Sequence, residues 1–361
     1  EVPNGVSYNS YVILDDKIAV MDTIDQRRTD EWLANVKEAL NGKAPDYLVV
    51  HHMEPDHAAN VKLFADMYPQ MKIVATAKAF TMMGQFFGDM FEDRQLVMNE
   101  GSTLELGHHT LTFFMAPMVH WPEVMVSYES TDKVLFSADG FGKFGALDAD
   151  EDWDCEARRY YFNIVGKYGA MVQMLLKKAA TLDVQIICPL HGPILTEDLG
   201  HYIGLYDTWS SYKLENTGIL VACASIHGNT KKAALELVEM LKARGEEIVE
   251  FTDLTRDDMA EAVEDAFRYD RMVLCCCTYD SGLFPAGEDF MAHLKAKTYQ
   301  NRKVGLVENG SWAPTAGKLM KAGFEAMKDI TLVGPIVNIK SALNDASRAQ
   351  LQQLADAMTA K

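Results

Sequence analysis

Residues 47–57 read YLVVHHMEPDH, an apolar strand-like run that ends in a cluster of histidines and carboxylates. In extended backbone, alternate side chains point the same way, so His52, Glu54 and Asp56 face one side. A helix that begins after them turns His57 back toward the same place. Four potential metal ligands within six residues, placed at the end of a strand, predict a metal site.

Three later residues have the same setting at the ends of apolar runs. His120 follows 113–119, Asp139 follows 134–138, and His191 follows 186–190. A lone histidine is usually structural, but here four of the ten histidines share this position with three carboxylates, which favours one common site. Structural or solvated roles are expected for the others: His51, His108, His109, His201, His227 and His293.

The types of ligand indicate which metal the site would take. The set is larger than one ion needs and suits two ions, with Asp139 as a bridge between them. It contains no cysteine and three carboxylates, which favours iron or manganese over zinc. Carboxylates also stabilise the trivalent state of such metals, so the composition of the site indicates redox chemistry rather than hydrolysis.

Composition limits the class of protein. The chain has 361 residues, 48% of them apolar and 24% charged, as expected of a globular protein with two domains. Its formal charge of −18 disfavours nucleic acid as a partner. No run approaches the ~20 apolar residues of a membrane span. The six cysteines form no C-x-x-C pair, which favours a reducing compartment such as the cytoplasm.

The chain changes character near residue 217. The first half alternates short strand-like runs with helices, including one long helix predicted over 155–180, and is expected to place strands inside and helices outside. The second half alternates strictly between strands and helices, which predicts a parallel sheet covered on both faces. Residues 208–217 are the expected connector.

A second type of site is predicted in this parallel half. The strand 219–224 is followed by Ser225-Ile226-His227-Gly228-Asn229-Thr230 and then by a helix. Hydroxyls, a glycine and backbone N–H groups at a helix N-terminus form an anion site. The loop lacks the lysine of a nucleoside triphosphate loop, so a single phosphate monoester fits better.

Two further loops at strand ends carry aromatic and small polar residues, where a flavin ring could lie against the backbone. They contain Thr278, Tyr279, Asp280, Ser281, Gly282 and Leu283 in one, and Asn309, Gly310, Ser311 and Trp312 in the other. With residues 225–230 they form the predicted flavin site. Cys275–Cys277 on the preceding strand are interpreted as core residues.

The order of these motifs resembles that of flavodiiron proteins, and nearly the whole chain is covered. The resemblance implies a metallo-β-lactamase-like αββα sandwich over residues 1–214, followed by a flavodoxin-like, doubly wound, five-stranded parallel sheet over 217–361. It implies one iron at His52, Glu54 and His120, another at Asp56, His57 and His191, and Asp139 as the bridge. FMN is the implied flavin. Family members begin a few strands before Asn9, so N-terminal strands are expected to be missing here.

The resemblance also implies an activity: reduction of dioxygen to water, of nitric oxide to nitrous oxide, or both. It implies a head-to-tail homodimer, possibly a tetramer, and a separate electron donor such as rubredoxin. Two alternatives stay open at this point. One is a dinuclear-metal hydrolase with a flavodoxin-like passenger domain, although zinc hydrolases of this fold usually have histidine at the position of Glu54. The other is an electron carrier with a vestigial metal site.

Overall fold

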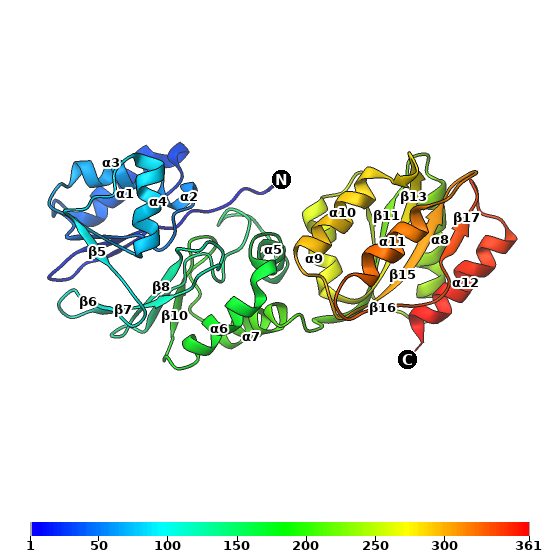
Figure 1. The fold of residues 1–361 in the computed structure, drawn as a ribbon. Helices are drawn as coiled ribbons and strands as arrows, with labels where there is room; N and C mark the ends of the chain where they lie inside the picture. The colour runs from blue at the N-terminus through cyan, green and yellow to red at the C-terminus, as the bar shows by residue number, and fades with distance from the viewer. Residues whose placement is uncertain (1, 361) are drawn as a thin grey trace. The chain divides into compact units, whose positions relative to one another are not determined.

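The computed structural model describes residues 2–360, which form two compact units that divide between Asp207 and Thr208 (Figure 1). The division lies at the start of the segment expected to be a connector. None of the helices in residues 2–360 has the length and apolar character that crossing a bilayer requires. Five of the six cysteines, all except Cys155, are buried as thiols outside any disulfide.

The first unit contains two five-stranded sheets that face each other. The first sheet has the order β1-β2-β3-β4-β5, with bounds Tyr11–Ile13, Ala19–Met21, Tyr47–Val49, Lys72–Ala75 and Gln95–Val97. The second has the order β10-β9-β8-β7-β6, with bounds Ile186–Cys188, Val134–Phe136, Met125–Glu129, Thr110–Met115 and Thr103–Glu105.

Alternation along the strands of the first sheet divides its side chains between two cores. Val20, Leu48 and Ile73 pack in the core that contains Trp32, Phe64 and Phe80 of the covering helices. Their neighbours Met21, Val49 and Val74 pack instead with Phe113, Met125 and Phe136 of the second sheet. This division follows from the two-residue period of a strand. The result is the predicted sandwich, with helices outside two sheets.

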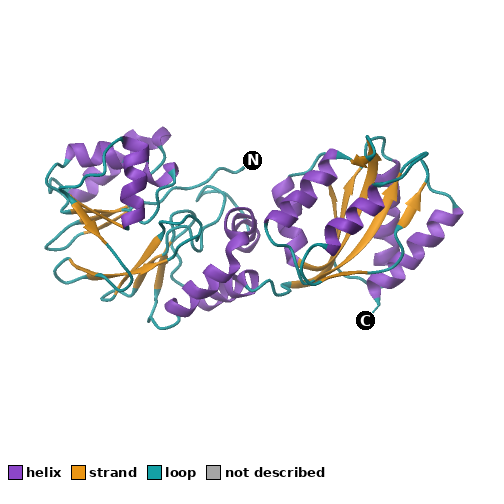
Figure 2. Ribbon diagram, in the orientation of Figure 1, coloured by secondary structure: helices purple, strands orange, loops and turns teal. Residues whose placement is uncertain are grey.

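The helices of this unit lie outside the sheets, as Figure 2 shows in purple. Their bounds are α1 Thr29–Leu40, α2 Pro55–Ala58, α3 Val61–Met67, α4 Ala77–Phe87, α5 Trp153–Tyr160, α6 Gly169–Ala179 and α7 Leu199–Ser210. The prediction of a single long helix over 155–180 is wrong. A π-helical turn at Tyr161–Val165 and a 3₁₀ turn at Gly166–Tyr168 separate α5 from α6. Tyr161 and Phe162 are buried in that turn, so packing of these rings overrides the regular helical repeat.

The second unit is a doubly wound parallel sheet. The main order is β12-β11-β13-β15-β16, and β17 pairs with the later part of β15, beyond the residues that pair with β16. Strand bounds are β11 Asn216–Ala224, β12 Val249–Asp253, β13 Tyr269–Tyr279, β14 Gly282–Leu283, β15 Arg302–Asn309, β16 Ile330–Leu332 and β17 Val337–Ile339. The order is that of flavodoxin, in which ligands bind beside the first strand of the fold. The fifth position is shared by β16 and β17, both parallel to β15.

Helices cover both faces of this sheet, with α8 and α12 on one face and α9, α10 and α11 on the other (Figure 1). Their bounds are α8 Asn229–Lys242, α9 Met259–Arg268, α10 Pro285–Ala296, α11 Ala316–Glu325 and α12 Asp345–Thr359. On the first of these faces, Val221 and Val273 of the sheet pack with Leu237 of α8 and Leu354 of α12. Strands buried on both faces account for the continuous apolar runs in the sequence.

Gly305 of β15 allows a close approach of α12, and its replacement by alanine should destabilise the second unit. A Cβ atom there would lie 2.8 Å from Leu354 Cδ1 and 3.1 Å from Met358 Sδ. Overpacking of this kind costs about 1–3 kcal/mol. We expect a lower denaturation midpoint of the second unit by circular dichroism. Gly200→Ala is the control because a Cβ atom there meets nothing within 4 Å; equal midpoints for both variants would contradict the packing argument.

Candidate metal centre and flavin loops

The predicted metal ligands follow the carboxyl ends of four strands. His52 lies just after β3, and Glu54 precedes α2, which contains Asp56 and His57. The other three ligands follow strands of the second sheet: His120 after β7, Asp139 after β9 and His191 after β10. Since β7, β9 and β10 run in the same direction, their ends share one edge of that sheet. The structure therefore brings all the predicted ligands to one place.

One group of donors consists of His52, Glu54, His120 and an oxygen of Asp139. His52 Nε2 lies 3.3 Å from His120 Nε2 and 3.3 Å from Glu54 Oε2. Asp139 Oδ2 lies 3.3 Å from His52 Nε2 and 3.0 Å from His120 Nε2. The four ligand atoms thus surround a common point.

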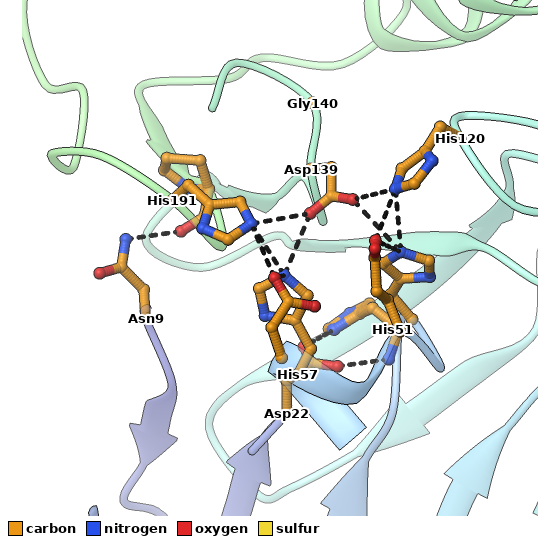
Figure 3. A network of polar contacts seen from close by, with 12 residues as sticks. Asn9, Asp22, His51, His57, His120, Asp139, Gly140 and His191 are labelled. Carbon is orange, nitrogen blue, oxygen red and sulfur yellow. Dashed lines mark hydrogen bonds and ion pairs between the residues drawn. The ribbon is translucent and has the colours of Figure 1, made fainter. Parts of the chain in front are cut away.

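A second group consists of Asp56, His57 and His191. The Nε2 atoms of His57 and His191 are 3.0 Å apart, and each lies 3.4 Å from Asp56 Oδ2. Here the other oxygen of Asp139 takes part, with Oδ1 3.3 Å from His57 Nε2 and 3.7 Å from His191 Nε2. Figure 3 shows Asp139 between the two groups, with one oxygen toward each.

These distances fit two cations better than they fit hydrogen bonds. Ligand atoms held about 2.1 Å from one ion lie about 3.0–3.4 Å from one another in octahedral or tetrahedral geometry. Two imidazole nitrogens facing each other at that distance lack an acceptor–donor match unless a proton or a metal lies between them. Both oxygens of Asp139 and Asp56 Oδ1 are also buried without a hydrogen-bond donor. The residues present therefore fit a dinuclear metal site.

The carboxylates of the site also need positive charge close by to balance them. Burial by itself would raise the pKa of Glu54, but His120 and His52 lower it to about 2. Burial would lower the pKa of His120, but Asp139 and Glu54 raise it to about 9. For the fully buried Asp139, the neighbouring histidines outweigh burial and hold its pKa well below the ordinary value. Without metal, protons on the imidazoles would have to balance these carboxylates.

Residues outside the ligand set orient the histidines, and sequence reasoning missed them. Glu123 Oε1 accepts hydrogen bonds from His52 Nδ1 and from the Met53 N–H, both at 2.8 Å. The Ser7 carbonyl lies 2.7 Å from His191 Nδ1. Each contact holds a proton on Nδ1 and leaves the Nε2 lone pair facing the site. The only signal in the sequence was a carboxylate three residues after His120.

His51 is buried and belongs to a separate network, which is the structural one of the two roles expected for it. Its Nδ1 lies 2.6 Å from Asp22 Oδ2, and its Nε2 lies 2.8 Å from Ser127 Oγ. All three side chains are buried, so no substrate can reach the serine. The network fixes the end of β3 against β8 and thereby positions His52.

Glu123→Ala should weaken metal binding without unfolding the protein. Loss of a carboxylate that orients a metal-bound histidine typically costs 10–100-fold in metal affinity. We expect iron to be lost to a competing chelator at a correspondingly lower chelator concentration. Glu123→Gln keeps an oxygen acceptor and should lose less. Unchanged iron retention in Glu123→Ala, with FMN content and circular dichroism as folding checks, would show that His52 does not need this contact.

The predicted phosphate loop connects β11 to α8. Gly228 adopts a φ of 84°, in the left-handed region that favours glycine, and Ser225 Oγ accepts its N–H at 3.1 Å. Thr230 is buried in the first turn of α8, and burial raises the pKa of the Cys277 thiol at the end of β13, while the nearby Ile226 N–H lowers it. The loop thus presents a helix N-terminus beside the first strand, a geometry that fits a phosphate monoester.

The two other predicted flavin loops follow β13 and β15 at the same edge of the sheet. The Thr278 hydroxyl accepts the N–H groups of Thr315 and Ala316, and the Asn309 side chain bonds to the backbone of Ser341. These two side chains therefore organise the loops themselves. Tyr279 and Trp312 are 46% and 93% exposed, so their rings are accessible to a ligand. Asp280 and Ser281 form the turn between β13 and β14, both with positive φ.

Fold and site together define a class: a β-lactamase-like sandwich with a dinuclear metal centre, joined to a flavodoxin-like unit. Residues 6–192 match the family described as "ODP family beta lactamase", and the chain belongs to that family. Its architecture is that of the flavodiiron proteins, in agreement with the resemblance seen in the sequence.

Individual relatives agree with this assignment. The chain is 28% identical over 334 residues to a nitric oxide reductase of Moorella thermoacetica, covering 90% of this chain and 83% of that one. It is 27% identical to a putative diflavin flavoprotein A 2 of Synechocystis, covering 86% of this chain but only 54% of the longer protein. The structure of the rubredoxin oxygen:oxidoreductase of Desulfovibrio gigas superposes with a TM-score of 0.90 at 25% identity, covering 99% of this chain and 91% of that one.

Proposed function

We propose that this protein is an oxidoreductase that reduces dioxygen to water, nitric oxide to nitrous oxide, or both, with iron in both metal positions and FMN at the 225–230 loop. The observation that carries the proposal is the placement of Asp139, whose two oxygens face two separate groups of donors. Two of the relatives, named an oxygen oxidoreductase and a nitric oxide reductase, support the same class of reaction.

The electron count supports this pair of cofactors. When bound, two ferrous ions and a reduced FMN supply four electrons, which with four protons convert dioxygen to two waters; two nitric oxide molecules need two electrons and two protons to give nitrous oxide and water. Glu54, Asp56 and Asp139 provide the negative charge that favours the oxidised metal state. Three carboxylates distinguish this site from one built of neutral imidazoles.

Aromatic rings lie against the histidines of the metal centre. Trp121 lies edge-on to His52 with 5.2 Å between ring centroids, and Tyr160 lies 5.5 Å from His191. Tyr8 lies 5.8 Å from His191. Burial raises the pKa of Tyr160 well above its ordinary value, so this phenol stays neutral beside the carboxylates.

The metal ligands and the flavin loops lie in different halves of the chain, and the proposed partners are those that would let electrons pass between them. We propose a head-to-tail homodimer, in which the flavin of one subunit serves the metal centre of the other, and a small electron-transfer protein of the rubredoxin type as donor. The name of the similar Desulfovibrio gigas protein, rubredoxin oxygen:oxidoreductase, supports such a donor. The cytoplasm is the proposed compartment, because five of the six cysteines are buried as free thiols.

The dimer predicts that turnover depends on protein concentration. Upon dilution below the dissociation constant of the dimer, the turnover per subunit should fall while iron and FMN stay bound. Measurement of gas consumption alongside mass photometry at each dilution tests this prediction. A monomer with full turnover would contradict the head-to-tail arrangement.

Anaerobic stopped-flow oxidation of the fully reduced protein with each gas tests the activity itself. We expect rapid flavin oxidation with at least one gas, together with two iron and one FMN per chain by metal and flavin analysis. A protein that holds zinc, binds no flavin and hydrolyses thioesters or lactams would refute the proposal. Comparing the rates for the two gases ranks the substrates.

A further inference from the structure

A separate group of nitrogen and oxygen donors lies at the far end of the second sheet from the metal centre. His109 precedes β7 and Asp132 precedes β9, whereas His120 and Asp139 follow these same strands. Since β7 and β9 both pair antiparallel with β8, they run in one direction, and their starts share an edge. The end of β8 contributes Glu129 to this edge.

The imidazole of His109 is held in a defined orientation. Asp15 Oδ2 accepts the backbone N–H of His109 and lies 2.7 Å from its ring Nδ1. With the Nδ1 proton held by this carboxylate, the lone pair of the neutral ring is on Nε2. That atom lies 3.4 Å from Asp132 Oδ2. A carboxylate behind a histidine is the arrangement that orients metal-bound histidines in general.

Glu129 supplies a third donor from a buried position. It is 2% exposed, and its oxygens accept the N–H groups of Thr131 and Asp132 at 2.7 Å each. A carboxylate oxygen has a second acceptor position after one such bond. One ligand atom from each of His109, Glu129 and Asp132 lies within 4.8 Å of the others.

The two turns that carry these residues are fixed without any ion. Thr131 Oγ1 donates to the His108 carbonyl at 2.9 Å, which ties the turn before β9 to the turn before β7. Gly107 has a φ of 129°, and a Cβ atom there would lie 2.7 Å from Asp15 Oδ1. Glycine therefore lets Asp15 approach the loop closely. The donor group is consequently organised before a ligand arrives.

We propose that His109, Glu129 and Asp132 bind a divalent first-row transition cation, for which zinc is the probe, with Asp15 as the positioning residue. One imidazole nitrogen and two carboxylate oxygens are ligands that zinc accepts, and three protein ligands leave a position for water. The side chain of Asp132 is 67% exposed, so the site opens to solvent. Three carboxylates around one imidazole leave net negative charge for the cation to balance.

Zinc titration of the iron- and FMN-loaded protein, with a chromophoric chelator in competition, tests the proposal. His109→Asn is the informative variant, because its amide can still bond to Asp15 but has no counterpart of Nε2. We expect the wild type to bind one more zinc equivalent than this variant, or to bind it at least tenfold more tightly. His108→Asn, an exposed neighbour outside the group, is the matched control and should behave like the wild type.

Asp132→Asn provides a second test, because an exposed side chain can be changed without disturbing the fold. It should also weaken zinc binding at least tenfold. Iron and FMN contents, measured after each titration, show whether zinc has entered the other metal centre instead. Equal zinc binding by the wild type, His109→Asn and Asp132→Asn would overturn the proposal and leave His109 as a structural residue that bonds to Asp15.

Discussion

Asp139→Ala is expected to abolish gas reduction and to lower the iron content, while FMN stays bound. Loss of a residue that merely orients a ligand costs 10–100-fold in metal affinity or activity. Asp139 contacts both groups of donors, at 3.0 Å from His120 Nε2 and 3.3 Å from His57 Nε2. We therefore expect a loss of about a hundredfold or more in turnover with either gas.

Two further variants distinguish loss of the bridging carboxylate from a change in side-chain volume. Asp139→Asn keeps the volume of the side chain and removes the negative charge, so it should lose nearly as much activity as the alanine variant. Asp66→Asn removes a carboxylate on the surface of the same unit and should change neither iron content nor turnover. Asp66 is 56% exposed. Normal turnover in Asp139→Asn would show that no shared carboxylate is needed.

Asn229→Asp is expected to release FMN while leaving the metal centre intact. The substitution changes the size of the side chain little but places a negative charge at the start of α8, beside the turn that would hold the phosphate. A like charge a few ångströms from a phosphate dianion costs on the order of 1–3 kcal/mol near a protein surface, which is about a ten- to hundredfold loss of affinity. Fluorescence titration of the flavin-free protein with FMN measures this loss.

Asn229→Ser is the neutral control for this prediction. It keeps a small polar side chain and should bind FMN within a few fold of the wild type. Iron content should be equal in both variants, because the metal ligands lie in the other compact unit. If aspartate and serine weakened FMN binding equally, the loss would come from the asparagine side chain and not from charge near a phosphate.

The residues proposed as metal ligands could be picked out from the sequence because each follows an apolar strand, a pattern that remains visible along the chain. The sequence predicted the second unit for the same reason, since strands buried on both faces form continuous apolar runs. Both features depend on local order along the chain.

Elements stabilised by distant contacts were harder to predict. β8 reads Met-Val-Ser-Tyr-Glu. Its polar residues Ser127 and Glu129 interrupt the apolar pattern, although all five residues of the strand are buried. Ser127 is buried because it bonds to His51, and Glu129 because it accepts N–H groups from the following turn. The partner of Ser127 lies 76 residues away, so no local pattern could show it. Glu123 escaped prediction for the same reason: its partner His52 comes from the other sheet.

Because the candidate metal ligands come from both sheets, bound ions would stabilise the first unit. His52 follows a strand of the first sheet, while His120, Asp139 and His191 follow strands of the second. Bound ions would therefore act as cross-links between the layers, and their binding energy would add to the unfolding free energy of this unit. Under iron starvation, the sandwich should loosen and become prone to proteolysis, while the flavodoxin-like unit keeps its melting temperature.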